Sequence, residues 1–95
     1  MIYVVSYDIK SDRIRNKLAK LLEGYGVRIQ YSVFECRITE KRFQKLYQDI
    51  FLLLDNDPEG SVRFYTLFKN CEDKILTIGK TMNDLSVLEK DVIVI

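Results

Sequence analysis

The sequence predicts an α+β domain in which two helices cover one face of an antiparallel sheet. Three observations support this fold class. Runs of β-forming residues and apolar stripes at helical spacing follow one another in the order strand, helix, strand, strand, helix, strand. The chain has 95 residues, a length that suits one compact domain. It contains no internal repeat, low-complexity tract or linker rich in glycine and proline, so one domain is expected.

The first strand is predicted over residues 2–7, which are apolar and rich in β-formers, and it leads directly into Asp8. A helix should follow, because apolar residues recur at helical spacing at Ile14, Leu18, Leu21, Leu22 and Tyr25. We expect Asp12 to be the N-cap and the Gly24-Tyr25-Gly26 turn to end the helix. Another face of this helix then carries Arg13, Lys17 and Lys20.

Two short strands are predicted next, over 27–30 and 32–38, with Tyr31 near the junction of a tight hairpin or bulge. Thr39 is a good N-cap for a second helix. Its apolar stripe is predicted to consist of Phe43, Leu46, Tyr47, Ile50, Phe51 and Leu54. The chain's single proline lies in the turn 55–60, and 61–68 reads as a strand with both faces largely apolar.

This order is that of the ferredoxin-like βαββαβ fold, with both helices on one face of the sheet. The first strand is apolar on both of its faces, so the uncovered sheet face should carry an apolar patch. A face-to-face homodimer is the simplest way to cover it. Residues 74–79 and 91–95 are predicted as further strands, the last one exchanged with the sheet of the other protomer. We expect 1–79 to form the core, and 80–95 a connector and final strand of the same domain.

Composition limits the chemistry that this chain can perform. Its formal net charge of +1 excludes a globally basic nucleic-acid binder, so any such contact must come from a local patch. The chain has no histidine, which excludes Ser-His-Asp and Cys-His catalysis as well as RNA hydrolysis by paired histidines. Cys36 and Cys71 lack metal-site spacing and are expected to be packed free thiols. Carboxylate, metal, tyrosine, lysine and arginine chemistry remain.

No stretch approaches the roughly 20 apolar residues of a membrane span. The N-terminus also runs directly into a strand pattern without a charged leader or a cleavage site. The sequence therefore predicts a cytoplasmic protein that does not enter a membrane.

The end of the first strand combines one carboxylate with several cations. Asp8 is followed closely by the segment Asp12-Arg13-Ile14-Arg15-Asn16-Lys17. A carboxylate can hold a divalent cation while Arg and Lys bind phosphodiester oxygens, so this arrangement suits a phosphate site. The alternative is that Asp8 only begins a turn and that the cations form a solvated helix face.

Four segments, in their order and spacing, resemble CRISPR-associated protein 2, the small ferredoxin-like component of spacer acquisition. The likeness covers most of the chain, from Met1 to about Gly79. Cys36 stands where many members carry glycine. The segments are Val4-Val5-Ser6-Tyr7-Asp8-Ile9, Asp12-Arg13-Ile14-Arg15-Asn16-Lys17-Leu18-Ala19-Lys20-Leu21-Leu22, Gly24-Tyr25-Gly26-Val27-Arg28-Ile29-Gln30-Tyr31-Ser32-Val33-Phe34-Glu35-Cys36 and Ser61-Val62-Arg63-Phe64-Tyr65.

The resemblance implies a homodimer in which the two Asp8 side chains face each other across the two-fold axis around a divalent cation, Mg²⁺ or Mn²⁺. It implies a metal-dependent endonuclease acting on single-stranded RNA or on double-stranded DNA, with Asp8 as the catalytic and metal-binding residue. Its alternative implication is a non-catalytic architectural adaptor that bridges pairs of the CRISPR-associated protein 1 integrase and holds prespacer DNA. A third class, a ferredoxin-like module that binds a small regulatory ligand, has no supporting motif.

The candidate nucleic-acid-binding residues are the cations in the segments nearest Asp8, namely Arg13, Arg15, Lys17 and Arg28. Arg15 and Arg28 also match positions implicated in the family that the chain resembles. Tyr7 and Phe34 are supporting residues that could stack a base or form the floor of the site, although aromatic strand residues are more often core. If the four cations only form solvated faces, the next candidates lie on the second helix: Lys41, Arg42 and Lys45.

Overall fold

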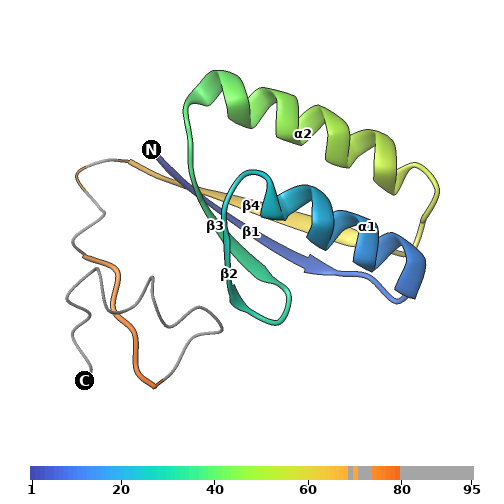
Figure 1. Cartoon of the computed structure of the whole chain (residues 1–95), viewed down its shortest axis with the longest axis horizontal. Coiled ribbons are helices and arrows are strands. Elements are labelled where there is room, and N and C mark those ends of the chain that lie inside the picture. Colours follow the sequence, from blue (N-terminus) through green and yellow to red (C-terminus); the bar gives the residue numbers. More distant parts are fainter. Residues whose placement is uncertain (69, 71–73, 80–95) are drawn as a thin grey trace.

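The computed structural model describes residues 1–68, 70 and 74–79. Its elements are β1 (Ile2–Asp8), α1 (Asp12–Glu23), β2 (Val27–Gln30), β3 (Val33–Arg37), α2 (Glu40–Leu54) and β4 (Ser61–Leu67). The strands form one antiparallel sheet in the order β2-β3-β1-β4, and both helices lie on one side of it (Figure 1). The predicted fold class, element order and helix placement are confirmed. β1 is thus a central strand, flanked by β3 and β4.

The helix boundaries follow from local capping, with one correction. The N-cap of α1 is Ser11, whose hydroxyl accepts a hydrogen bond from the Ile14 amide at 3.3 Å. The prediction that Asp12 caps the helix was wrong, because the adjacent serine takes that position and leaves Asp12 in the first helical turn. Thr39 caps α2 as predicted, accepting from the Arg42 amide at 3.2 Å. α1 ends at Gly24, also as predicted.

The core lies between the helices and one face of the sheet. Strand alternation sets Tyr3, Val5 and Tyr7 of β1 on this face, and all three are buried. They share the core with buried residues of the other elements: Ile14, Leu18, Leu22, Phe34, Cys36, Leu46 and Ile50. The Cys36 thiol is free, as predicted, and Cys71 lies outside the described residues.

Gly26, which directly precedes β2, lies very close to the backbone of β3 near Cys36. A Cβ atom at Gly26 would lie 2.3 Å from the Glu35 carbonyl oxygen and 2.7 Å from the Cys36 sulfur. Only glycine fits at this position without displacing backbone. The register of β2 on β3 then shifts between Arg28 and Gln30, which agrees with the predicted bulge near Tyr31.

The apolar stripe predicted on α2 is wider than the surface that the sheet covers. Leu46 and Ile50 are buried, whereas Tyr47 is 49% exposed and Phe51 65% exposed. These two rings lie where α2 runs beside β4, the outer strand at that end of the described sheet. Only the side of the stripe that carries Leu46 and Ile50 therefore belongs to the core.

The outer face of the sheet is less apolar than expected. Val4 lies opposite Glu35 on β3 and Tyr65 on β4, and Ser6 and Asp8 continue the same row along β1. Tyr65 is 46% exposed, but Ile2 at the start of the row is fully buried. Glu35 is buried and forms an ion pair with Arg37 at 3.1 Å. The predicted patch is thus a mixed surface.

The strand predicted over 74–79 is absent, because these described residues form no strand. Leu76 and Ile78 are exposed there. A β-forming pattern specifies no partner backbone, and without a partner it does not form a strand. The predicted connector and final strand, over 80–95, lie outside the described residues. Within the described residues, neither helix has the length and apolar character needed to cross a membrane.

Candidate functional site

Asp8 is the last residue of the central strand β1 and pairs with Ser61 of β4. Its side chain is exposed, and alternation points it to the outer face of the sheet, opposite to Tyr7. Nowhere in the described residues do three His, Cys, Asp or Glu side chains gather in a way that could hold a metal ion. One chain therefore presents Asp8 as a single accessible carboxylate.

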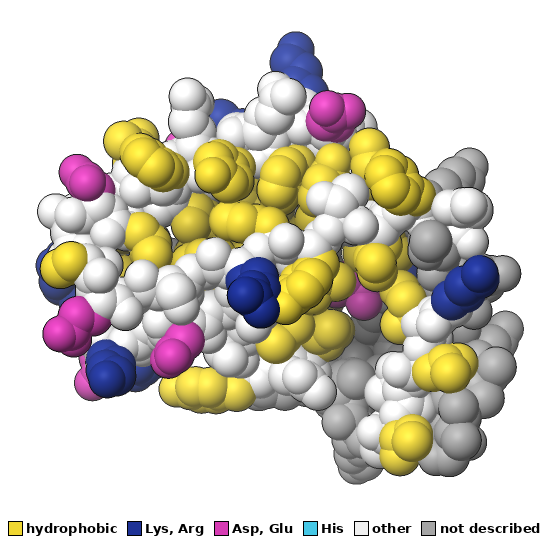
Figure 2. Space-filling view, turned by 180° about the vertical axis from the view of Figure 1, so that it is seen from behind, with side chains coloured by type: hydrophobic (Ala, Val, Ile, Leu, Met, Phe, Trp, Pro, Cys, Tyr) yellow, Lys and Arg dark blue, Asp and Glu magenta, His cyan; other side chains and the backbone are white. Residues whose placement is uncertain are grey.

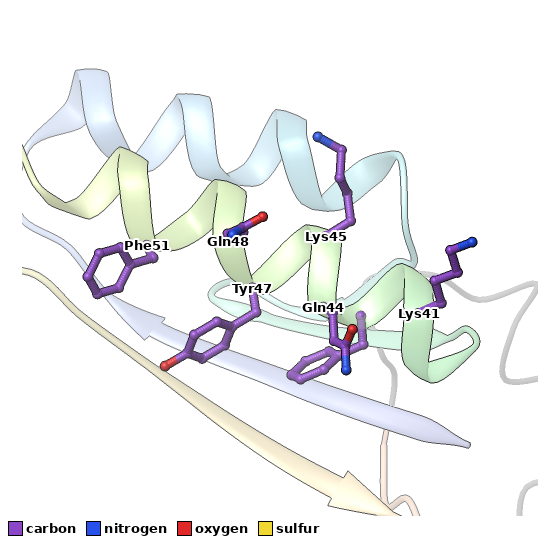
Figure 3. Close-up of a pocket in the computed structure, with 7 residues that line it drawn as sticks. Lys41, Gln44, Lys45, Tyr47, Gln48 and Phe51 are labelled. Atoms are coloured by element: carbon purple, nitrogen blue, oxygen red, sulfur yellow. The ribbon is translucent and has the colours of Figure 1, made fainter.

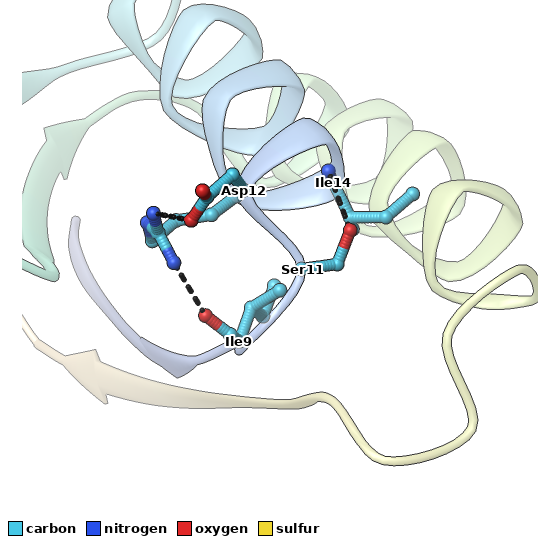
Figure 4. A network of polar contacts seen from close by, with 5 residues as sticks. Ile9, Ser11, Asp12 and Ile14 are labelled. Carbon is cyan, nitrogen blue, oxygen red and sulfur yellow. Dashed lines mark hydrogen bonds and ion pairs between the residues drawn. The ribbon is translucent and has the colours of Figure 1, made fainter.

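Arg15 connects α1 to the segment that directly follows Asp8. Its guanidinium donates to the Ile9 carbonyl oxygen at 3.0 Å and forms an ion pair with Asp12 (Figure 4). The hydrogen bond to Asp12 raises the pKa of Arg15, and the Tyr31 phenol adds to this effect. These contacts hold the charged Arg15 guanidinium close to the end of β1, paired with the Asp12 carboxylate.

Arg28 lies on the helix-covered side of the sheet, where β2 pairs with β3. Its guanidinium carbon lies 5.3 Å from the centre of the Phe34 ring, a cation–π contact. The Tyr7 ring packs on Phe34 with centroids 6.4 Å apart. Burial raises the pKa of Tyr7, while the charges of Arg28 and Arg15 oppose the rise. Both guanidinium groups are therefore close enough for their charges to act on Tyr7.

The burial of Tyr7 and Phe34 favours one of their two expected roles. Tyr7 is 5% exposed and Phe34 is fully buried, so neither ring offers a face to a base. Both rings belong to the core and form a floor that supports Arg28. Arg13 and Lys17 are exposed on α1, four residues apart, and thus lie one helical turn from each other.

The structure therefore separates residues that the sequence places together. Arg28 and Tyr7 both pack on Phe34 at the helix-covered side of the sheet, and Arg15 extends from α1 to the Ile9 carbonyl, whereas the Asp8 side chain points to the other face. Arg13 and Lys17 face solvent on α1. Asp8 and the cations are thus close along the chain, but strand alternation points Asp8 and its neighbour Tyr7 to opposite faces of the sheet.

Sequence reasoning located Tyr31 at the hairpin junction but gave it no role. The residue is 65% exposed in the turn between β2 and β3, and its carbonyl oxygen accepts from the Tyr7 hydroxyl at 3.4 Å. Its phenol lies close enough to hydrogen-bond Arg15 and to raise the pKa of that residue. An aromatic residue in a short polar turn was the signal that could have marked it.

A second feature of the surface is an apolar groove of ≈ 270 Å³ between α2 and β4. Apolar side chains form a band across this side of the molecule (Figure 2). In Figure 3, Tyr47 points from α2 toward the sheet, whereas Lys41 and Lys45 point away from it. Lys45 forms an ion pair with Asp49 at 3.5 Å, and Arg42 packs over the Tyr25 ring at 4.7 Å.

Comparisons with known proteins agree with the resemblance seen in the sequence. The profile of the family described as CRISPR associated protein Cas2 matches residues 1–75. The chain belongs to the Cas2 family. A CRISPR-associated endoribonuclease Cas2 from Synechocystis sp. is 48% identical over 66 residues, which cover 70% of this chain and 71% of the relative.

Solved Cas2 structures share the fold. The crystal structure of Cas2 from Streptococcus pyogenes matches with a TM-score of 0.71 and 33% identity, over 83% of this chain and 100% of that one. A chain of a partial Cas6-RT-Cas1–Cas2 complex matches with a TM-score of 0.70 and 36% identity, over 81% of this chain and 89% of that one. The family and fold expected from the sequence are thus confirmed.

Proposed function

We propose that this Cas2 chain acts in CRISPR spacer acquisition as a homodimer that hydrolyses phosphodiester bonds in RNA or double-stranded DNA with the help of a divalent metal ion. The observation that carries the proposal is the accessible Asp8 carboxylate at the end of the central strand, beside the turn that Arg15 binds. The Synechocystis relative is named an endoribonuclease, which supports this class of activity.

The proposed metal ligand is Asp8. Carboxylate oxygens are ligands that Mg²⁺ prefers, but Mg²⁺ requires six donors and one chain offers a single carboxylate here. The other nearby carboxylate, Asp12, forms an ion pair with Arg15. We therefore propose that Asp8 from two copies of the chain holds Mg²⁺ or Mn²⁺ together with substrate phosphate and water. The bound ion would supply a water of lowered pKa and would neutralise phosphate charge.

The remaining residues would bind and orient the nucleic acid. A guanidinium offers two parallel donors to a phosphate, and Arg15 is already held in place by the Ile9 carbonyl and Asp12. Arg28, supported by Phe34, would supply a second such contact. Arg13 and Lys17, on the exposed side of α1, would bind phosphates further along the nucleic-acid strand.

The proposed dimer brings the outer sheet faces of two chains together. Asp8 and Val4 lie in the same row on this face, and Tyr65 pairs with Val4 in register. Packing of the two faces would cover Tyr65 and would place the two Asp8 residues near the two-fold axis.

A second candidate function is that of an architectural adaptor without catalysis. The specific observation in its favour is that Arg15 and Arg28 lie on the side of the sheet opposite to the Asp8 side chain. Backbone binding thus does not require Asp8. In this role the dimer would bridge the Cas1 integrase and hold prespacer DNA. The similar chain in the Cas1-containing complex supports the association with Cas1.

One comparison separates the two functions: wild type, Asp8→Ala, and Glu40→Gln as a control. Glu40 is exposed near Tyr3, at the opposite end of β1 from Asp8. Each protein is tested for cleavage with Mg²⁺ or Mn²⁺ and for spacer integration with Cas1. Loss of cleavage alone in Asp8→Ala supports an enzyme with a separate scaffold role. Cleavage by wild type that Asp8→Ala retains would refute the catalytic role and leave the adaptor.

A further inference from the structure

We propose that Tyr31 is a base-stacking residue, whose exposed ring packs against an unpaired base of a strand whose phosphates contact Arg15 and Arg28. This inference rests on the proposed nucleic-acid binding and deepens it, because it names the residue that would stack on an unpaired base. It concerns positioning of the substrate and assigns Tyr31 no part in the chemical step.

The first support is that hydrogen bonds from Tyr7 hold the turn that carries Tyr31. The Tyr7 amide donates to the Ser32 carbonyl oxygen at 3.0 Å, and the Tyr7 hydroxyl donates to the Tyr31 carbonyl oxygen at 3.4 Å. The turn between β2 and β3 is thus tied to the central strand at two successive residues. An aromatic ring on a tied turn loses little conformational freedom when it binds a ligand.

The second support is the charge around the ring. The Tyr31 phenol lies within hydrogen-bonding reach of the Arg15 guanidinium, which the Ile9 carbonyl and Asp12 also hold. Arg28 rests on the Phe34 ring, which packs on Tyr7, and among the described residues Arg28 forms no ion pair. An exposed aromatic ring thus lies beside one fixed guanidinium, and a second guanidinium rests on the neighbouring core rings. Cations combined with an exposed aromatic ring are typical of sites that bind single-stranded nucleic acid.

The third support is the exposure of Tyr31 compared with its aromatic neighbours. Tyr7 and Phe34 are buried, while Tyr31 is 65% exposed. Of the three aromatic side chains at this end of the sheet, only Tyr31 can offer a ring face to a ligand. Bases inside a duplex are already stacked on one another, so the ring adds affinity only where a base is unpaired or at an end.

The experiment measures binding of 2-aminopurine-labelled single-stranded RNA and DNA, and of a duplex labelled at an internal position, without divalent ions. The variants are Tyr31→Ala and Tyr31→Phe, with Tyr47→Ala as a control in which another half-exposed tyrosine is removed from α2. Stacking predicts that Tyr31→Ala weakens single-strand binding by roughly 5- to 150-fold and abolishes the quenching of 2-aminopurine, with little change for the duplex. Tyr31→Phe keeps the ring and should retain both quenching and most of the affinity.

Each outcome decides the proposal. Quenching that persists unchanged in Tyr31→Ala overturns it, and so does an equal loss in Tyr31→Phe, which would assign the effect to the hydroxyl and Arg15. An equal loss in Tyr47→Ala overturns it too, because the effect would not be specific to the turn. If wild type binds neither probe, the nucleic-acid function fails together with the inference; if wild type binds and only the Tyr31 effect is missing, the inference alone fails.

Discussion

Removal of the Arg28 side chain should change how strongly nucleic-acid binding depends on salt. Arg28 has no ion-pair partner among the described residues and rests on the Phe34 ring, so its charge is available to a phosphate. In a homodimer, Arg28→Ala removes two phosphate contacts. Each contact contributes about 0.9 to the slope of log affinity against log salt for duplex DNA, so the slope should fall by about 1.8.

The slope translates into affinities that are simple to measure. Between roughly 50 and 200 mM salt, two contacts account for a factor of about 12 in duplex affinity, so the loss of affinity in wild type should exceed that in Arg28→Ala by this factor. For a single strand, at about 0.7 per contact, the corresponding factor is about 7. Loss of the cation–π contact should cost only about 0.5–1 kcal/mol of folding stability, so the variant remains folded.

The assay is a fluorescence-anisotropy titration across the salt series without divalent ions. Lys45→Ala serves as the matched control, because Lys45 is exposed on α2 and is paired with Asp49. An unchanged slope in Arg28→Ala would refute the assignment of this residue to phosphate binding. A fall in slope in Lys45→Ala alone would move the nucleic-acid surface to α2, together with Lys41 and Arg42.

Three further predictions concern packing, titration and assembly. Gly26→Ala should lower the free energy of unfolding by about 1–3 kcal/mol in urea titrations, since its methyl group would overlap the Glu35 carbonyl; equal stability would show that β2 can shift freely. Burial raises the pKa of Cys36 from 9.0 to about 11, so folding stability should be lost as pH rises from about 9 through about 11. Cys36→Ala should lose less stability over that range, and identical pH profiles would contradict this. Truncation after Glu89 should weaken dimerisation in sedimentation experiments, and a fully dimeric truncated protein at low micromolar concentration would argue against exchange of the final strand.

Local sequence patterns determined the elements of this fold. The alternation of β1, the helical spacing of Ile14, Leu18 and Leu22, and the Gly24 stop are properties of short windows, so the sequence alone predicts them. The N-cap of α1 was missed by one residue because Ser11 and Asp12 are both good caps. The prediction of a strand at 74–79 was wrong because strand formation depends on a partner strand, which a local pattern does not specify.

The candidate site shows the same division between local pattern and tertiary structure. The sequence by itself placed Asp8 at a strand end and indicated which cations lie near it along the chain. Only the tertiary structure decided that the Asp8 carboxylate and the pair Arg15 and Arg28 belong to opposite sides of the sheet, and that Tyr31 stands exposed beside Arg15. The physical reason is that contacts between β1, α1 and the β2–β3 turn depend on strand register and helix packing, which join residues distant in sequence and leave no mark in any single segment.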